Sequence, residues 1–315
     1  MKYGNIKNVD KKVSRLIYGC AIGDFFSGGD MSEILDAVVD AGINTLDTAR
    51  IYRLSEKSVG DWMEKRGNRD DLVILTKCAH PLEDGIKRVN RKEILDDFRV
   101  STGYLKTGYI DIYMMHRDDP DCDLRDVMET LSELHEAGKI GAIGASNWTS
   151  DRIEKANETA YKYGLTEITV SSPHLSAVDQ VRDPWAGGVV TITGEKNRYQ
   201  REWYRETKFP LIAYSSLAHG FLSGRVTDEE SAKRLLDESA VTGYDCPENY
   251  IKLKRIREVA ENRGSTVALV SMAWLFHQDM DVYAAVSSLN PARIRENVKA
   301  LDMELTKEEL EYIEG

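Results

Sequence analysis

The sequence predicts an α/β fold in which eight parallel strands close into a single (β/α)8, or TIM, barrel. Short apolar runs of β character alternate with longer segments of helical periodicity, which is typical of parallel strands joined by right-handed crossovers. Eight such strand–helix pairs fit into about 290 residues of the chain. A count of eight at this length favours a closed barrel over an open sheet.

The expected elements follow from the apolar periodicity along the chain. Strands are predicted within Ser14–Ile22, Ile43–Thr48, Leu72–Lys77, Asp111–His116, Ile140–Ser146, Glu167–Ser172, Pro210–Ser216 and Val282–Ser288. Helices are predicted over Ser32–Ala41, Ser55–Lys65, Arg91–Lys106, Leu124–Ala137, Asp151–Tyr163, Tyr199–Glu206, Glu248–Asn262, Val267–Phe276 and Ala292–Leu301.

Both ends of the chain carry elements outside the barrel pattern. Turn residues within 1–13 predict a small N-terminal β-hairpin, and Thr306–Glu314 predicts a C-terminal helix. Thr306 is the expected N-cap of that helix, with Glu309 as its capping-box partner. No linker or low-complexity tract interrupts the chain, so residues 1–315 are expected to form one domain.

Composition excludes several classes of protein. The N-terminus lacks the basic flank and apolar run of a signal peptide, and no apolar stretch is long enough to span a membrane. The four cysteines form no CxxC pair, which favours reduced thiols in a cytoplasmic protein. The net charge of −11 is spread along the chain and disfavours nucleic acid as a partner. The oligomeric state stays open, and a homo-oligomer is compatible with the sequence.

Polar residues stand at or just past the ends of consecutive predicted strands. Asp47 and Lys77 end strands two and three, and His116 ends strand four. Each shares a face with the residues two and four positions earlier, which are apolar apart from Thr45, so it is expected to point into the barrel. Chemistry gathers at the carboxyl ends of barrel strands. Asp47 and Lys77 lie on neighbouring strands and are expected to pair, because an isolated buried charge is costly.

Tyr52, five residues after Asp47, completes a set suited to acid–base chemistry. A tyrosine is a poor acid at neutral pH, and a neighbouring ammonium is expected to lower its pKa into a more useful range. A histidine can orient a carbonyl oxygen by donating a hydrogen bond. The alternative is a structural Asp47–Lys77 ion pair beside a core histidine, but four such residues in consecutive elements favour catalysis. The set contains no nucleophile–base pair, and no metal site is predicted.

Several motifs resemble the aldo-keto reductase superfamily along nearly the whole chain. The ordered series is far more specific than any one motif. It consists of D-T-A-x-x-Y at 47–52, Lys77, His116, Gly138-Lys139-Ile140-Gly141, G-A-S-N-W at 144–148, Ala213-Tyr214-Ser215-Ser216-Leu217, Gly220-Phe221-Leu222-Ser223-Gly224, and Ser287-Ser288 with Arg293 and Glu296-Asn297.

The resemblance implies a reductase of aldehydes, ketones or sugars that binds NADP(H) across the barrel mouth. No GxGxxG follows a predicted strand, in agreement with the absence of a Rossmann domain, and Gly138, Gly141 and Gly144 are explained by close packing of a strand. The resemblance assigns Tyr52 as general acid, Lys77 and Asp47 as the residues that tune it, and His116 as the residue that orients the carbonyl. The cofactor-binding residues that it implies are Ser146 and Asn147 at the carboxamide, Ser172 near it, Tyr214 stacked on the nicotinamide ring, and Ser288, Arg293 and Asn297 at the adenosine end. Ser215 and Leu217, in the same segment as Tyr214, are also expected to bind the cofactor.

Three positions depart from the pattern of many family members. Ser172 stands where many have glutamine, which puts one carboxamide contact in doubt. Ser216 replaces a proline, and Ser287 stands where many NADPH-preferring members have lysine. Arg293, in the first turn of the last predicted barrel helix, is then the main expected ligand of the 2′-phosphate. The alternative for Arg293 is a solvated helix residue.

Other segments invite functional interpretation. The acidic run Asp118–Asp123 is expected to be a solvated turn that caps the next helix rather than a cation site. His80 and His174 follow strands three and six, where each either lines the substrate pocket or has no role. The long segment Ala177–Asn197, with Trp185, is predicted as a lid over the barrel mouth. Packing for stability or an oligomer contact is the alternative.

Three functions follow from these features. The first is an NADP(H)-dependent carbonyl reductase with a small-molecule substrate. The second is a regulatory subunit with the same barrel that binds the cofactor mainly as a sensor. The third is an unrelated barrel lyase in which Lys77 forms a Schiff base.

Overall fold

Eight parallel strands close into a barrel in the order β10-β3-β4-β5-β6-β7-β8-β9, which confirms the predicted fold. The computed structural model describes residues 1–82, 85–185 and 187–315. An antiparallel pair, β1 with β2, forms the predicted N-terminal hairpin. The strands are β1 (Tyr3–Gly4), β2 (Val13–Ser14), β3 (Leu16–Gly19), β4 (Thr45–Asp47), β5 (Val73–Cys78), β6 (Ile110–Met115), β7 (Ile140–Ser146), β8 (Ile168–Ser172), β9 (Leu211–Ala213) and β10 (Val282–Val286).

Helices alternate with these strands, and each predicted helix is present within a few residues of its expected ends. They are α1 (Ser32–Asp40), α2 (Ser55–Arg66), α3 (Arg91–Leu105), α4 (Leu124–Glu136), α5 (Ser150–Tyr163), α6 (Arg198–Thr207), α7 (Glu229–Leu235), α8 (Glu238–Tyr244), α9 (Pro247–Asn262), α10 (Val267–Phe276), α11 (Pro291–Asn297) and α12 (Lys307–Glu314). The short helices α7 and α8 are additions to the prediction. The predicted helix Ala292–Leu301 is divided, because α11 ends at Asn297 and a 3-10 helix continues over Val298–Asp302.

The chain forms two compact units, each described by itself below. The first unit comprises residues 1–172 and 287–294, and the second comprises residues 173–286 and 295–315. The expectation of one domain stays a prediction. Over the described ranges, no helix has the length and apolar character needed to cross a membrane.

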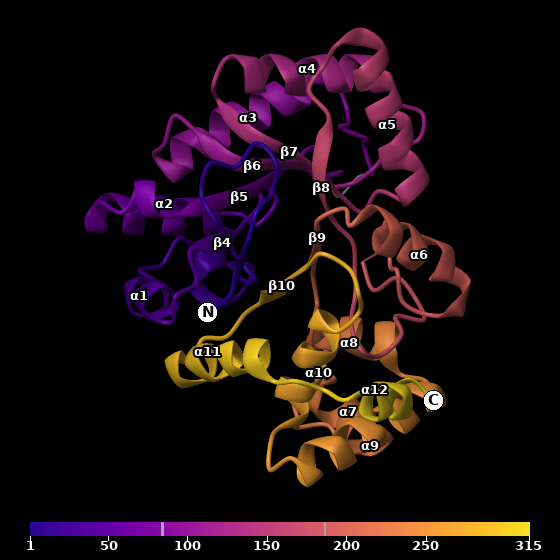
Figure 1. Ribbon diagram of the computed structural model, residues 1–315. Coiled ribbons are helices and arrows are strands. Elements are labelled where there is room, and N and C mark those ends of the chain that lie inside the picture. The colour runs from indigo at the N-terminus through magenta and orange to yellow at the C-terminus, as the bar shows by residue number, and fades with distance from the viewer. Residues whose placement is uncertain (83–84, 186) are drawn as a thin grey trace. The chain divides into compact units, whose positions relative to one another are not determined.

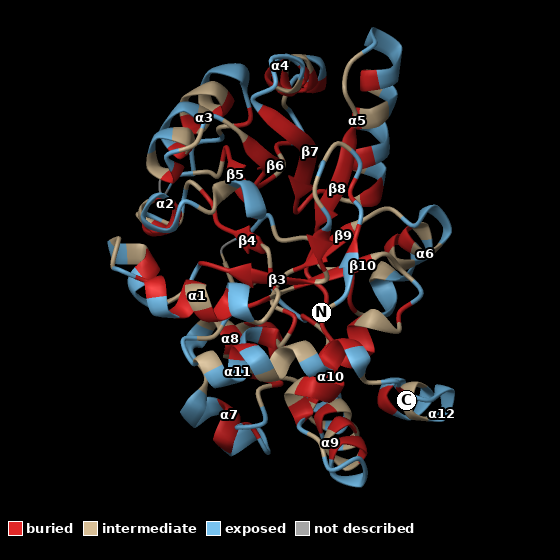
Figure 2. Cartoon of the chain, turned by 60° about the vertical axis from the view of Figure 1, so that its left-hand side comes forward, coloured by how far each residue is buried: buried red, intermediate tan, exposed pale blue. Residues whose placement is uncertain are grey.

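The first unit is built around buried strands covered by amphipathic helices. Every residue of β5, β6 and β7 is buried, and Figure 2 shows these strands in red. Figure 1 shows α2 to α5 on the outer side of β4 to β8. In α4, buried apolar residues recur three or four positions apart, and Asp123 caps the first turn by accepting from the N–H groups of Arg125 and Asp126. Local periodicity and capping therefore agree with the observed layers.

Close packing explains the glycines of β7. A Cβ atom on Gly144 would lie 2.4 Å from Cγ of Met114 on the neighbouring strand. A Cβ atom on Gly141 would lie 2.6 Å from the carbonyl oxygen of Asp111. Both distances are shorter than ordinary van der Waals contact, so only glycine fits. The predicted explanation by strand packing is confirmed for Gly141 and Gly144. It is wrong for Gly138, which lies in the turn before β7 with φ of 64°, where a Cβ atom would meet nothing within 4 Å.

The second unit contains a buried helix and the capped C-terminal helix. Eight of the ten residues of α10 are buried, in agreement with its nearly continuous apolar sequence. Thr306 and Glu309 form the predicted capping box of α12. Beyond β8, His174 pairs with the segment around Thr191, because its N–H donates to the Val190 carbonyl and its carbonyl accepts from Ile192. This pairing holds part of the predicted lid segment, of which Ala186 lies outside the described residues.

Candidate active site

Asp47 and Lys77 form the buried ion pair that the sequence predicts. They lie at the ends of the adjacent strands β4 and β5, where Asp47 is aligned with Leu75. Nζ of Lys77 donates to Oδ1 of Asp47 and, at 3.1 Å, to the carbonyl oxygen of Thr48. Asp47 is only 7% exposed and Lys77 only 3%, so each charge depends on the other for compensation.

Tyr52 lies beside this pair, in the turn that follows β4. Its N–H donates to the Ala49 carbonyl at 2.9 Å, which fixes the turn. The Lys77 Nζ atom lies 5.4 Å from the centre of the Tyr52 ring. The ring also meets His116 edge-on, with ring centres 5.6 Å apart and an interplanar angle of 84°. All four residues predicted to be catalytic therefore lie together in the first unit.

The pKa of Tyr52 differs in direction from the prediction. Burial raises its pKa above the ordinary value, and the positive charge of Lys77 opposes this effect without overcoming it. The expectation of a lowered pKa is thus wrong, because desolvation of the phenolate outweighs the attraction of the ammonium. A raised pKa keeps the hydroxyl protonated at neutral pH, as a proton donor requires.

Lys77 stays protonated in this environment. Burial alone lowers its pKa, but the negative charge of Asp47 and the hydrogen bond to that carboxylate outweigh burial and raise it. A Schiff-base lysine needs the opposite shift, since only the neutral amine is a nucleophile. The ion pair with Asp47, which stabilises the charged form of Lys77, therefore argues against the lyase hypothesis.

His116 is a buried, neutral imidazole. It follows β6 directly and is 5% exposed. Burial lowers its pKa well below the ordinary value, and the charges of Lys77 and Arg117 act in the same direction. Its Nδ1 atom is buried without a hydrogen-bond partner among the described residues. A neutral imidazole carries one N–H donor, which suits it to orient a carbonyl oxygen.

Ser146, Asn147 and Ser172 meet at the ends of β7 and β8, next to His116. The Ser146 hydroxyl donates to the Ser172 carbonyl at 3.0 Å, and the Asn147 N–H donates to the same oxygen at 3.1 Å. The Asn147 side chain donates to the His116 carbonyl at 3.2 Å, from a backbone with φ of 59°. The structure thus brings three predicted cofactor residues to the predicted catalytic histidine.

The segment before α11 is tied to β3 by two hydrogen bonds. The Ser287 hydroxyl donates to the Gly19 carbonyl at 2.7 Å, and the Tyr18 hydroxyl donates to the Ser288 carbonyl at 3.0 Å. Arg293 follows in the first turn of α11 and is exposed. Among the residues that the structure describes, no carboxylate forms an ion pair with it. Sequence reasoning missed Tyr18, since its partner is far along the chain.

The remaining predicted cofactor residues belong to the second unit. Tyr214, Ser215 and Leu217 follow β9, and Asn297 ends α11. The Tyr214 ring lies 6.2 Å from the ring of Trp185, which lies 5.0 Å from that of His219. These three rings form an aromatic cluster that the sequence did not predict.

His174 is not a pocket residue, because it is fully buried within the second unit. Its Nδ1 atom contacts the Thr191 hydroxyl at 2.8 Å, and its Nε2 atom contacts the Tyr244 hydroxyl at 2.9 Å. Burial lowers its pKa to about 3. His174 is therefore a structural residue of this unit.

The acidic run Asp118–Asp123 forms a turn whose carboxylates have partners. Asp118 pairs with Arg152 at 3.0 Å, and Asp119 accepts from Lys87. Asp123 caps α4, as predicted. No cluster of three potential metal ligands is present in the described part of the chain.

The chain is similar to known proteins over most of its length. The model of the aldo/keto reductase family matches residues 15–315. A putative aryl-alcohol dehydrogenase of Schizosaccharomyces pombe is 26% identical, with 99% of this chain and 94% of that protein covered. The aldo-keto reductase YhdN of Bacillus subtilis is 29% identical over 73% of this chain and 66% of its own length.

Two further matches bear on fold and function. A putative voltage-gated potassium channel subunit beta of Schizosaccharomyces pombe is 28% identical, with 87% of this chain and 80% of that protein covered. The crystal structure of the thermostable aldo-keto reductase Tm1743, in complex with the inhibitor epalrestat, superposes with a TM-score of 0.73. It covers 100% of this chain and 99% of that one at 23% identity, so the likeness concerns the fold.

Proposed function

Because the chain belongs to the aldo/keto reductase family, an oxidoreductase family acting on carbonyls, we propose that it reduces an aldehyde, ketone or sugar with NADP(H). The observation that carries this proposal is the contact set of Asp47, Lys77, Tyr52 and His116. Reduction of a carbonyl requires a hydride at carbon and a proton at oxygen. NADP(H), when bound, supplies the hydride.

Tyr52 delivers the proton in the proposed reaction. Its raised pKa keeps the hydroxyl protonated before reaction, and the phenolate left behind is stabilised by the Lys77 ammonium. Asp47 holds Lys77 in place and balances its charge. His116 donates a hydrogen bond to the carbonyl oxygen, which places that oxygen near the Tyr52 hydroxyl. This division of roles uses each of the four residues once.

The first unit offers groups that fit the proposed cofactor. Ser146, Asn147 and Ser172 present amide and hydroxyl groups beside His116, as binding of a carboxamide requires. Arg293 is an exposed guanidinium without an ion-pair partner in the described ranges, as binding of a 2′-phosphate requires. The further residues that would hold NADP(H) are Tyr214, Ser215, Leu217, Ser288 and Asn297.

A substrate panel tests the proposal. Aldehydes, ketosteroids and sugars are each mixed with the protein and NADPH, and the loss of NADPH absorbance is followed. We expect turnover of at least one simple aldehyde. Absence of turnover across the panel, with tight NADPH binding retained in a fluorescence titration, would contradict the proposal.

The second candidate is a cofactor-sensing regulatory subunit. The similarity to the putative potassium channel subunit beta favours it, whereas the complete catalytic set disfavours it. The same panel separates the two functions, because a sensor binds NADPH with little or no turnover. Steady reduction of a simple aldehyde assigns the chain to the enzymes.

A further inference from the structure

His80 extends the row of rings at the proposed catalytic site. It lies two residues past the end of β5, three residues after Lys77. Its ring meets the His116 ring edge-on, with centres 4.8 Å apart and an interplanar angle of 72°. Tyr52 contacts His116 at 5.6 Å. The three rings therefore run from Tyr52 through buried His116 to His80, and both Tyr52 and His80 are half-buried.

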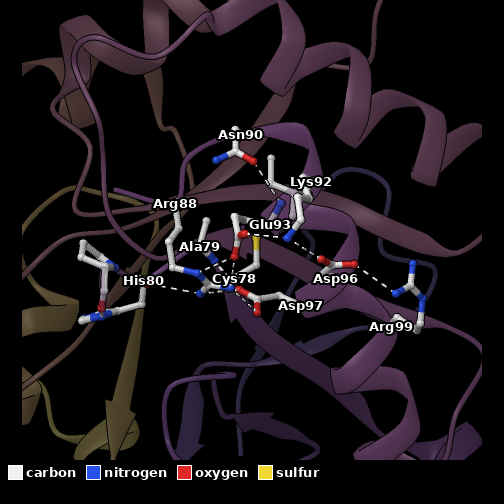
Figure 3. A network of polar contacts seen from close by, with 12 residues as sticks. Cys78, Ala79, His80, Arg88, Asn90, Lys92, Glu93, Asp96, Asp97 and Arg99 are labelled. Carbon is white, nitrogen blue, oxygen red and sulfur yellow. Dashed lines mark hydrogen bonds and ion pairs between the residues drawn. The ribbon is translucent and has the colours of Figure 1, made fainter. Parts of the chain in front are cut away.

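An ion pair between buried Asp97 and half-buried Arg88 holds the backbone on both sides of His80 (Figure 3). Asp97 of α3 accepts from the Ala79 N–H at 2.8 Å, where φ is 57°. The same carboxylate accepts from both terminal nitrogens of Arg88, at 2.8 and 3.0 Å. Arg88 also donates to the His80 carbonyl at 3.3 Å. Two-point contacts between a guanidinium and a carboxylate fix geometry strongly, so His80 is held in a defined position.

The hydrogen bond of the His80 ring defines its tautomer. Nδ1 lies 2.7 Å from the carbonyl oxygen of Pro81, and a carbonyl oxygen only accepts, so Nδ1 carries the proton. Burial lowers the pKa of His80, and the charges of Arg117 and Arg88 oppose its protonation as well. The neutral ring then has Nε2 as a hydrogen-bond acceptor.

We propose that His80 determines substrate specificity by accepting a hydrogen bond from a hydroxyl group of the substrate near its reacting carbonyl. The inference rests on the proposed function, in which His116 binds the carbonyl oxygen. In the row of rings, His80 is the polar side chain that follows His116. A polar group of the substrate close to the carbonyl that His116 binds would therefore lie near His80. Because Nε2 accepts and does not donate, the complementary group is a donor. The favoured substrate class is hydroxylated carbonyls, such as hydroxyaldehydes and open-chain sugars.

The test compares two aldehydes of equal chain length, glyceraldehyde and propanal, with wild type and His80→Phe. A single neutral hydrogen bond is worth about ten-fold in affinity at most. We expect wild type to prefer glyceraldehyde in kcat/KM, and His80→Phe to reduce that preference by about ten-fold, mainly through KM. The kcat for propanal should stay within about three-fold, since propanal offers no hydroxyl to His80.

Two further variants keep the result interpretable. His80→Gln retains an acceptor and should recover part of the preference. His135→Phe is the matched control, because His135 is also half-buried with its Nδ1 atom on a carbonyl oxygen, that of Gly141 at 2.8 Å. It lies at the end of α4, before β7, and should leave the preference unchanged.

Three outcomes would overturn the inference. The first is an unchanged preference in His80→Phe, and the second is an equal loss with both aldehydes. The third is turnover of neither aldehyde by wild type. The full substrate panel then shows whether the proposed function fails as well, and this distinguishes the third outcome from the first two.

Discussion

The Nζ atom of Lys77 lies 5.4 Å from the centre of the Tyr52 ring while it donates to Asp47. One ammonium thus compensates a buried carboxylate and faces the proposed proton donor. Burial acts on the same tyrosine in the opposite direction and raises its pKa. The balance between these two effects makes substitutions at this pair informative.

Replacing Tyr52 by phenylalanine should lower kcat by about 100-fold or more, because the proposed proton donor is removed. The affinity for NADPH should stay near that of wild type, since the hydroxyl has no proposed role in cofactor binding. Steady-state kinetics and a fluorescence titration with NADPH measure the two effects. A kcat close to that of wild type would exclude Tyr52 from the mechanism.

Replacing Lys77 should separate charge from geometry. Lys77→Met leaves Asp47 buried without its partner, so we expect a loss of about 3–5 kcal/mol in the free energy of unfolding together with a loss of activity. Lys77→Arg keeps the charge but changes its shape, so stability should suffer less than activity. Urea unfolding and kcat are measured for both variants.

The pattern of the two losses decides the role of the ion pair. If Lys77→Arg and Lys77→Met lose stability and activity to the same extent, the pair is purely structural. Lys57, whose side chain is 45% exposed and pairs with Asp61 one helical turn away in α2, supplies the control. Lys57→Met should change stability by less than about 1 kcal/mol, as expected for a surface pair.

The Asp47–Lys77 pair shows what the sequence could predict. Period-two alternation and the adjacency of consecutive strands were sufficient to predict that these two side chains meet. Both rules act within one strand or between neighbouring elements, so they can be applied to the sequence alone. The hydrogen bond from Tyr18 to Ser288 spans 270 positions, and no local pattern signals it. The pairing of Arg88 with Asp97 depends in the same way on how one segment folds back onto α3.

The direction of the Tyr52 pKa shift marks a second limit of sequence reasoning. The neighbouring charge was foreseen, but the extent of desolvation depends on everything packed around the ring.

Helices α7 and α8 were missed because of their length. Each has only seven residues, too few for a clear helical period.

The buried histidine His174 should make stability sensitive to acid. Its pKa is about 3 in the folded chain and near 6.5 in the unfolded chain, so the unfolded state binds its proton first. The contribution of His174 to the free energy of unfolding is complete above about pH 6.5 and is lost as the pH falls towards about 3. We expect the free energy of unfolding to fall by up to about 1.4 kcal/mol per pH unit across this window because of His174.

A comparison of wild type with His174→Gln isolates this effect. Between pH 6 and 4, unfolding of His174→Gln should take up about one proton fewer than unfolding of wild type. The free energy of unfolding should therefore fall less steeply with falling pH in the variant. Urea unfolding at several pH values provides the measurement, and equal slopes for wild type and His174→Gln would contradict the assignment.

Cofactor choice should depend on Arg293. Its guanidinium is exposed in the first turn of α11, and no described carboxylate competes for it. A charge-assisted contact with the 2′-phosphate is worth about 1.5–3 kcal/mol, or about one to two decades in Kd. We therefore expect NADPH to bind at least about ten-fold more tightly than NADH.

Arg293→Ala should largely abolish this difference, whereas Arg295→Ala, at another exposed arginine of α11, should preserve it. Ser287 cannot supply a lysine-like cation, and its hydroxyl is already bonded to Gly19, so little compensation is available. Fluorescence titration with both cofactors decides the matter, and equal affinities in wild type would show that the missing lysine outweighs the remaining arginine.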